Sequence, residues 1–187
     1  MNTAGPDEIA RSDQVAKLPV RRGPRPTTTN RAPHSQLDQQ AAPMLSPALL
    51  ERLSTLPGVS LGPSRRAPPG MVGLQLAGSD LRRSGRAFLI DAEFAHVHPG
   101  EDGSLHLTLP EPLRSDAIAA CWAEAHPAVG LPTISPDTVM VYAPRDEEEV
   151  DVVTALVTAF WRNAQADGLT PSPVHATNNS ITHLSGE

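Results

Sequence analysis

Residues 93–109 read EFAHVHPGEDGSLHLTL, and this stretch decides the fold. Its two ends, residues 93–98 and 104–109, alternate apolar and polar side chains as half-buried β-strands do. The loop between them contains one Pro, two Gly and two acidic residues, which is typical of a hairpin turn. In the second run three leucines share one face and His106 lies on the other. The stretch therefore predicts an antiparallel hairpin with one apolar face and one polar face.

The predicted hairpin gathers histidines on its polar face. His96 and His98 lie two residues apart in the first strand, so they share a face. If the loop joins the strands directly, antiparallel pairing sets His96 opposite His106, with Cβ atoms ~5 Å apart. The same register places Phe94 on the histidine face. Glu93 has the opposite parity in a regular strand and would need a local twist to join the histidines.

Three histidines on one sheet face allow three kinds of role. Imidazole is a common ligand of zinc, copper and iron, so the cluster could bind a metal ion. Imidazole also titrates near neutral pH, so the same side chains could act as general bases. Alternatively, each ring could be structural, with a hydrogen bond to a backbone or side-chain partner. These roles stay open at the level of sequence, and the metal stays unassigned.

Weaker sequence patterns outside the hairpin predict helices and further strands, which together indicate an α+β fold. Apolar residues at helical spacing predict helices, and short apolar runs between Gly and Pro clusters predict further strands. We expect a small antiparallel sheet packed against about three helices. The helices are expected over residues 46–56, 112–124 and 146–164, and the additional strands over residues 59–61, 72–77, 87–90 and 138–143.

The two ends of the chain lack this periodicity. Residues 1–45 are rich in Pro, Thr and Gln, and residues 168–187 are similarly polar. Such segments bury too little apolar area to offset the entropy lost on ordering. We therefore expect a disordered Pro-rich head, an ordered domain over residues 46–167 and a disordered tail. The head is expected to be dispensable for folding.

The overall composition excludes several classes of function. The net charge of −6 argues against nucleic-acid binding, and the single cysteine, Cys121, excludes an internal disulfide or a Cys-rich zinc site. The sequence contains no Gly-rich phosphate-binding motif, so no nucleotide cofactor is expected. No apolar run is long enough for a membrane span, which predicts a soluble, cytoplasmic protein. Nearly all basic residues are arginine, as in GC-rich bacterial genomes.

Further motifs follow the hairpin along the chain. Trp122 precedes the pair His126–Pro127, and residues 142–149 read YAPRDEEE. In order and spacing these motifs and the hairpin resemble the core of the fungal luciferase family over residues 87–164. Fungal members of that family are oxygenases. They add molecular oxygen to a hydroxylated α-pyrone, 3-hydroxyhispidin, and the excited product emits light.

This resemblance implies an active-site face built from four histidines and one arginine. The histidines would be His96, His98, His106 and His126, and Arg145 would neutralise an enolate or a peroxide anion. Molecular oxygen would be the co-substrate, and a small enolisable aromatic or pyrone compound would be the ligand. The polar head differs from the apolar N-terminal segment of the fungal enzymes, so light emission is not expected. The alternative to an oxygenase is a non-catalytic module of the same fold that binds small molecules or proteins.

Overall fold

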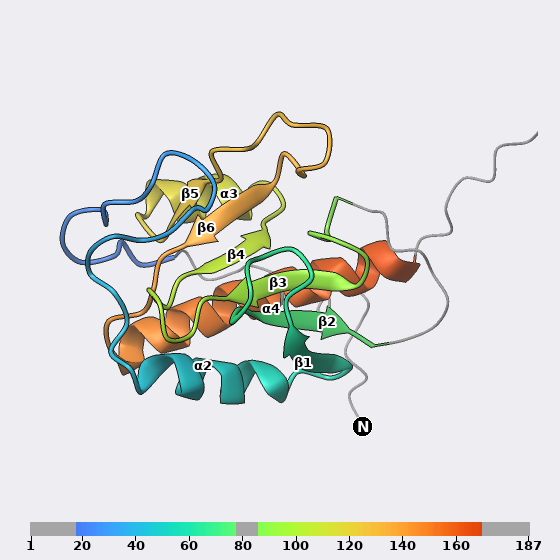
Figure 1. The fold of residues 1–187 in the computed structure, drawn as a ribbon, viewed down its shortest axis with the longest axis horizontal. Helices are drawn as coiled ribbons and strands as arrows, with labels where there is room; N and C mark the ends of the chain where they lie inside the picture. Colours follow the sequence, from blue (N-terminus) through green and yellow to red (C-terminus); the bar gives the residue numbers. More distant parts are fainter. Residues whose placement is uncertain (1–17, 78–85, 170–187) are drawn as a thin grey trace, which may run out of the picture.

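Six antiparallel strands form one sheet in the computed structural model, which describes residues 18–77 and 86–169 (Figure 1). The strand order is β1-β2-β3-β4-β6-β5, so the predicted hairpin supplies the two central strands, β3 and β4. The strands are β1 (Val59–Pro63), β2 (Val72–Leu76), β3 (Glu93–Val97), β4 (Leu105–Thr108), β5 (Ala123–Ala125) and β6 (Thr138–Val141).

Three helices accompany this sheet in the described part of the chain: α2 (Leu45–Ser54), α3 (Leu113–Ala119) and α4 (Glu147–Leu169). The long helix α4 runs behind the sheet, with α2 alongside it (Figure 1). The predicted α+β class, with a small antiparallel sheet and about three helices, is therefore confirmed. None of the helices among the described residues combines the length and the apolar character needed to cross a bilayer.

The hairpin forms with the predicted register. β3 and β4 pair antiparallel, with His96 directly opposite His106. The leucines of β4 are fully buried on the other face, together with Ala95 and Val97 of β3. This apolar face packs against α4, as the period of two in the sequence requires.

One irregularity in β3 changes which side chains share the histidine face. Two consecutive residues of β2 pair with Ala95 and Glu93, so Phe94 is the extra residue of a β-bulge. The bulge turns Phe94 into the core, where its ring lies 5.7 Å from that of Phe160, and it brings Glu93 against His96. The predicted placement of Phe94 beside the histidines, with Glu93 facing away, is therefore wrong. Regular alternation does not hold across a bulge.

Residues 18–43 differ most from the expected disordered head. They follow a definite path beside β5 and β6 (Figure 1, blue) and bury Arg21, His34 and Gln36. The Gln36 side-chain oxygen accepts a hydrogen bond of 2.9 Å from the Ala143 backbone N–H. Low hydrophobicity predicted disorder, but polar contacts to the sheet hold this segment. Its dispensability for folding is therefore no longer expected.

Two elements differ in extent from the prediction. The helix expected over residues 112–124 ends at Ala119, because Cys121 has a left-handed backbone conformation with φ of 62° that a right-handed helix cannot continue. The chain then enters the short edge strand β5. Residues 87–90, expected as a strand, form only an isolated bridge at Ile90.

The last helix begins where its acidic sequence predicts. The Asp146 carboxylate accepts a hydrogen bond of 2.9 Å from the Glu149 N–H and so caps the first turn. Of the head and tail expected to be disordered, residues 1–17 and 170–187 lie outside the described residues. The apolar stripe of α4 is fully or almost fully buried and consists of Val150, Val153, Leu156, Val157 and Phe160.

Phe160→Ala tests the placement of α4 against the sheet. The Phe160 side chain is fully buried against Phe94. Its truncation should lower the free energy of unfolding by ~3–5 kcal/mol, because it leaves a cavity in the core. Arg162→Ala, at an exposed position of the same helix, is the matched control and should change it by less than ~0.5 kcal/mol. Urea denaturation measures both, and equal midpoints would contradict the placement.

Gln36→Ala tests whether the N-terminal segment belongs to the fold. The Gln36 amide bonds the Ala143 N–H and the backbone carbonyls of Asp38 and Gln39. Its removal leaves these groups without partners and should lower the free energy of unfolding by ~1–3 kcal/mol. Arg31→Ala, at an exposed position of the same segment, should cost less than ~0.5 kcal/mol. If the two variants melt at the same temperature, the segment is not held to the sheet.

Candidate functional site

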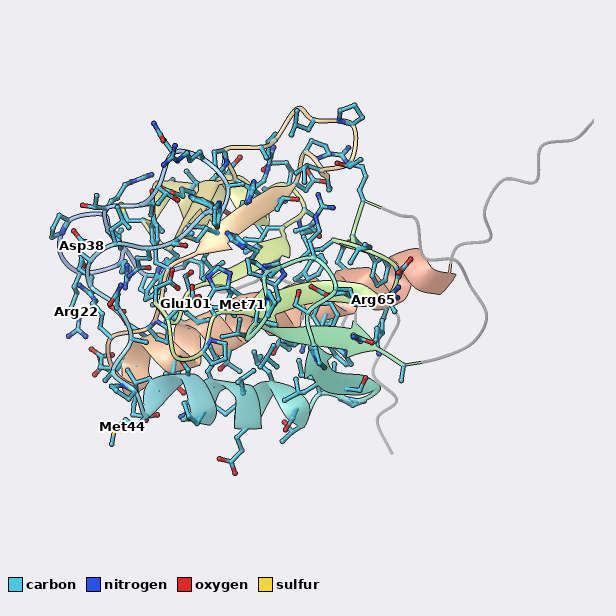
Figure 2. The ribbon with its side chains drawn as sticks, in the orientation of Figure 1. Arg22, Asp38, Met44, Arg65, Met71 and Glu101 are labelled. Carbon is cyan, nitrogen blue, oxygen red and sulfur yellow. The ribbon has the colours of Figure 1, made fainter. Side chains whose placement is uncertain are left out.

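A cavity of about 500 Å³ opens on the polar face of the central strands. This volume lies in the range of pockets that hold small organic ligands. In Figure 2 the labelled side chains of Met71 and Glu101, which both line the cavity, lie over the middle of the sheet. Its larger apolar lining residues are Pro33, Pro68, Met71, Leu89, Leu131 and Ile134.

All four predicted histidines line this cavity, and a fifth joins them. His96, His98 and His106 come from the hairpin, His126 follows β5, and His34 comes from the N-terminal segment. The His106 ring contacts each of the other four, with centroid distances between 4.9 Å and 5.3 Å. The predicted clustering is therefore confirmed, with His106 at its centre.

Carboxylates hold the outer nitrogens of three of these rings. The pairs are His96 Nδ1 with Glu93 Oε1 (3.0 Å), His98 Nδ1 with Asp102 Oδ1 (3.4 Å) and His34 Nε2 with Glu124 Oε1 (2.8 Å). Burial raises the pKa of each carboxyl, but hydrogen bonds from the histidines and from neighbouring groups outweigh it, so all three pKa values lie below the ordinary value. An ionised carboxylate only accepts, so His96 Nδ1 and His34 Nε2, which are hydrogen-bonded to Glu93 and Glu124, each carry a proton. His98 Nδ1 also lies 3.3 Å from the Ser104 hydroxyl, so a proton on this nitrogen faces both Ser104 and Asp102. In a neutral ring with its proton at that nitrogen, the other nitrogen has a lone pair.

Glu93 is fixed in place by the strands around it. Its carboxylate accepts hydrogen bonds from the Ser64 hydroxyl at 2.7 Å and from the Arg65 N–H at 2.6 Å. Gly73 lies opposite His96 on β2, and a Cβ added there would lie 3.0 Å from Glu93 Oε2. Any larger residue at this position would press on the carboxylate that orients the His96 ring.

His106 joins two of the outer rings into a continuous chain. Its Nδ1 lies 3.0 Å from His96 Nε2, and its Nε2 lies 3.3 Å from His34 Nδ1. With a carboxylate at each end, the chain runs Glu93–His96–His106–His34–Glu124. Both ring nitrogens of His106 therefore face other histidines.

Burial favours the neutral forms of His96, His106 and His126. Loss of hydration lowers the pKa of His96 and, together with the charges of the surrounding histidines, holds that of His106 well below its ordinary value. Burial and the charge of His34 lower the pKa of His126 to about 4. His126 Nδ1 accepts a hydrogen bond of 3.1 Å from the Ala128 N–H, so in the neutral ring Nε2 carries the proton.

Arg145, predicted to stand beside the histidines, lies elsewhere and does not line the cavity. Its guanidinium binds the Glu149 carboxylate and, at 2.7 Å, the Arg22 carbonyl. Glu149 is buried and also forms an ion pair of 3.0 Å with Arg21. In Figure 2 the labelled Arg22 lies at the outer edge of the molecule, away from Met71. The prediction is corrected: the Arg145 charge is neutralised locally and ties the start of α4 to the N-terminal segment.

Two cavity residues were missed by the sequence analysis. His34 stands in a Pro-rich stretch without periodicity, so nothing in the local pattern marked it as buried. Arg66 lines the cavity from the connection between β1 and β2, and its guanidinium donates to the Thr133 carbonyl at 3.3 Å. Arg66 rather than Arg145 therefore brings positive charge to the cavity.

The cluster can accept protons or bind a metal ion. Two sets of three histidines have ligand atoms within 4.8 Å of one another: His96, His98 and His106, and His34, His106 and His126. Neutral imidazoles with free lone pairs are bases as well as ligands. All five line a cavity rather than a closed core, so a bound molecule would meet them.

Acidification should destabilise the domain through His126. Its pKa is about 4 in the folded chain and 6.5 as a model value, so the unfolded chain binds the proton first. The free energy of unfolding should therefore be unaffected above pH ~6.5 and should fall as the pH decreases from there toward 4. His126→Gln should show a shallower fall in thermal melts across this window. An identical pH dependence in the variant and the parent would show that His126 is not held neutral by burial.

Comparison with known proteins gives relatives for this chain. Residues 91–159 match the family model described as the Luciferase domain. The luciferase of Armillaria ostoyae is 31% identical over 164 residues, covering 76% of this chain and 59% of that relative. The luciferase of Armillaria mellea is 29% identical over 173 residues, with the same coverage. That of Neonothopanus nambi is 38% identical over 69 residues, or 36% of this chain and 26% of the relative. No solved structure matches the chain.

The matched region and the cavity coincide. Residues 91–159 contain the hairpin, His126 and most of α4, so they include four of the five cavity histidines. The chain spans about three fifths of the length of the Armillaria relatives. The chain is therefore similar to the fungal luciferases over most of its length, and the part that matches the Luciferase domain holds most of the cavity histidines.

Proposed function

We propose that this luciferase-like domain is an oxygenase-type enzyme that acts on a small enolisable aromatic or pyrone compound. The observation that carries the proposal is a cavity of about 500 Å³ in which buried histidines meet apolar side chains. The apolar lining suits a flat ring, and the imidazoles suit the hydroxyl groups on it. The similarity to fungal luciferases also supports the proposal, because the fungal members of that family are oxygenases.

The chemistry begins with a proton transfer that the hairpin histidines are suited to make. His96 donates Nδ1–H to Glu93, and a proton on His98 Nδ1 faces the Ser104 hydroxyl and Asp102, which leaves the Nε2 lone pair of each ring free to receive a proton. Loss of the proton from an enolic hydroxyl gives an enolate, whose electron-rich carbon reacts with molecular oxygen. A carbon–oxygen bond forms, and the negative charge passes to the peroxide oxygen.

Two other cavity residues would stabilise the anions formed along this path. Arg66 supplies a positive charge at the cavity lining. The neutral His126 ring carries its proton on Nε2 and can donate it in a hydrogen bond to an oxyanion. Light emission is not part of the proposal, and the cytoplasmic location stays a prediction.

Oxygen uptake by the full chain tests the proposal. Uptake is measured with an oxygen electrode in the presence of 3-hydroxyhispidin and of simpler hydroxylated α-pyrones and phenols, and products are identified by mass. We expect uptake with at least one compound and its loss, by more than ~100-fold, in His96→Ala and His106→Ala. Arg162→Ala, on the exposed face of α4, should behave like the parent.

The same compounds distinguish a binding module from an enzyme. A ligand present at 100 times its Kd stabilises the folded chain by ~2.7 kcal/mol, which a thermal melt detects. Stabilisation by a pyrone or phenol together with oxygen uptake supports the oxygenase. Stabilisation without any uptake would contradict it and favour a non-catalytic module on the luciferase-like fold.

A further inference from the structure

We propose that His96, His98 and His106 form a binding site for one divalent transition-metal ion, with an open coordination position toward the cavity. The inference goes beyond the proposed oxygenase activity and does not rest on it, because ion binding is measured without substrate. Three observations carry it: the number of protons available to the histidine chain, the convergence of free ring nitrogens and the charge of the buried carboxylates.

When its three rings are neutral, the histidine chain has one proton fewer than its four contacts require. From Glu93 through His96, His106 and His34 to Glu124 there are four close polar contacts but only three rings. A neutral imidazole carries a single N–H, and an ionised carboxylate only accepts. Three protons satisfy three contacts, so two lone pairs face each other in the fourth. Because His96 donates to Glu93 and His34 donates to Glu124, the deficit falls on a contact of His106.

The position of His98 indicates that the contact without a proton is the one between His96 and His106. His98 Nδ1 faces the Ser104 hydroxyl at 3.3 Å and Asp102 Oδ1 at 3.4 Å, so a proton on Nδ1 leaves Nε2 free, and the His98 ring lies 4.9 Å from that of His106. If His106 donates Nε2–H to His34, its Nδ1 faces His96 Nε2 at 3.0 Å. One ring nitrogen from each of these three histidines lies within 4.8 Å of those from the other two. A cation among them satisfies all three.

The second set of three histidines is less suited to a metal ion. His126 accepts the Ala128 N–H at Nδ1, so the neutral ring presents an N–H at Nε2 instead of a lone pair. His34 Nδ1 is already the acceptor for His106 in the arrangement above. The ion therefore belongs on the hairpin side of His106, and His126 remains a hydrogen-bond donor.

The distance between the His96 and His106 nitrogens and the carboxylates behind the rings both fit a metal ion. Zinc–nitrogen bonds of about 2.0–2.1 Å in tetrahedral geometry place ligand nitrogens ~3.3 Å apart, close to the 3.0 Å between His96 and His106. Glu93 and Asp102 are 1% and 2% exposed and are paired with these histidines, as carboxylates behind metal-bound imidazoles are. Two buried negative charges beside neutral rings also favour a divalent cation.

The ligand set indicates which ions fit. Imidazole nitrogens suit zinc, copper, iron and nickel, and three protein ligands leave a position for water or a substrate oxygen. His96, His98 and His106 all line the cavity, so this position would face a bound ligand. With an ion bound, the lone pairs of His96 and His98 are occupied, so the ion would replace them as the group that favours deprotonation, by holding the enolic oxygen.

Titration of the full, untagged chain with Zn²⁺ and Co²⁺ tests the site. The protein is first treated with a chelator and dialysed; Zn²⁺ binding is then followed by calorimetry and Co²⁺ binding by visible absorption. We expect close to one ion per chain and Co²⁺ bands typical of low coordination number. Binding should be lost in His98→Gln and His106→Gln. Glu93→Gln should weaken Zn²⁺ binding by ~10–100-fold, because the carboxylate orients a ligand.

His126→Gln is the matched control, since it removes a cavity histidine that the geometry excludes as a ligand, and it should bind Zn²⁺ like the parent. Circular dichroism checks that each variant is folded; if His106→Gln is not, His98→Gln decides the question. A folded parent that binds neither ion would overturn the inference, as would binding lost in His126→Gln but kept in His98→Gln. Ion binding without oxygen uptake supports the metal site and counts against the oxygenase, whereas oxygen uptake by a parent chain that binds neither ion supports the oxygenase and overturns the metal site.

Discussion

The antiparallel pairing of β3 with β4 is the constraint on which the rest of the structure depends. It sets His96 opposite His106, with their ring nitrogens 3.0 Å apart. A slip of β4 by one residue would turn His106 into the core and the leucines of β4 into the cavity. Leu105 and Leu107 are fully buried against α4, and this hydrophobic packing holds the register. Burial on one face of the sheet therefore determines the geometry of the polar face.

The polar face is completed by contacts that come from far along the chain. Residues 18–43 bring His34 against His106, and the His34 ring is anchored by Glu124 of β5. Glu93 reaches His96 because of the bulge in β3. Burying such a polar network costs stability unless each group has a partner. Here each partner also fixes the orientation of an imidazole, which is the arrangement that a metal ion or a substrate requires.

Much of the central sheet could be predicted from the sequence, because alternation with a period of two is a local signal. The pairing of His96 with His106 follows from that alternation and from a short loop. The position of Glu93 could not be predicted, since its bulge arises from pairing with the distant strand β2. His34 was missed because polar contacts, rather than an apolar pattern, hold its segment. The error over Arg145 came from the family resemblance; its partner Glu149 lies four residues along, a spacing that favours a local ion pair.

The placement of protons on the five rings is the central claim, and long-range ¹H–¹⁵N correlation spectra of the histidine side chains test it most directly. At neutral pH we predict Nδ1–H for His96 and His98, whose Nε2 lone pairs then face the cavity. His34, His106 and His126 should carry the proton on Nε2. Nε2–H on His96 or His98 would contradict the account, because it would remove the lone pairs that both the proton transfer and the metal site require.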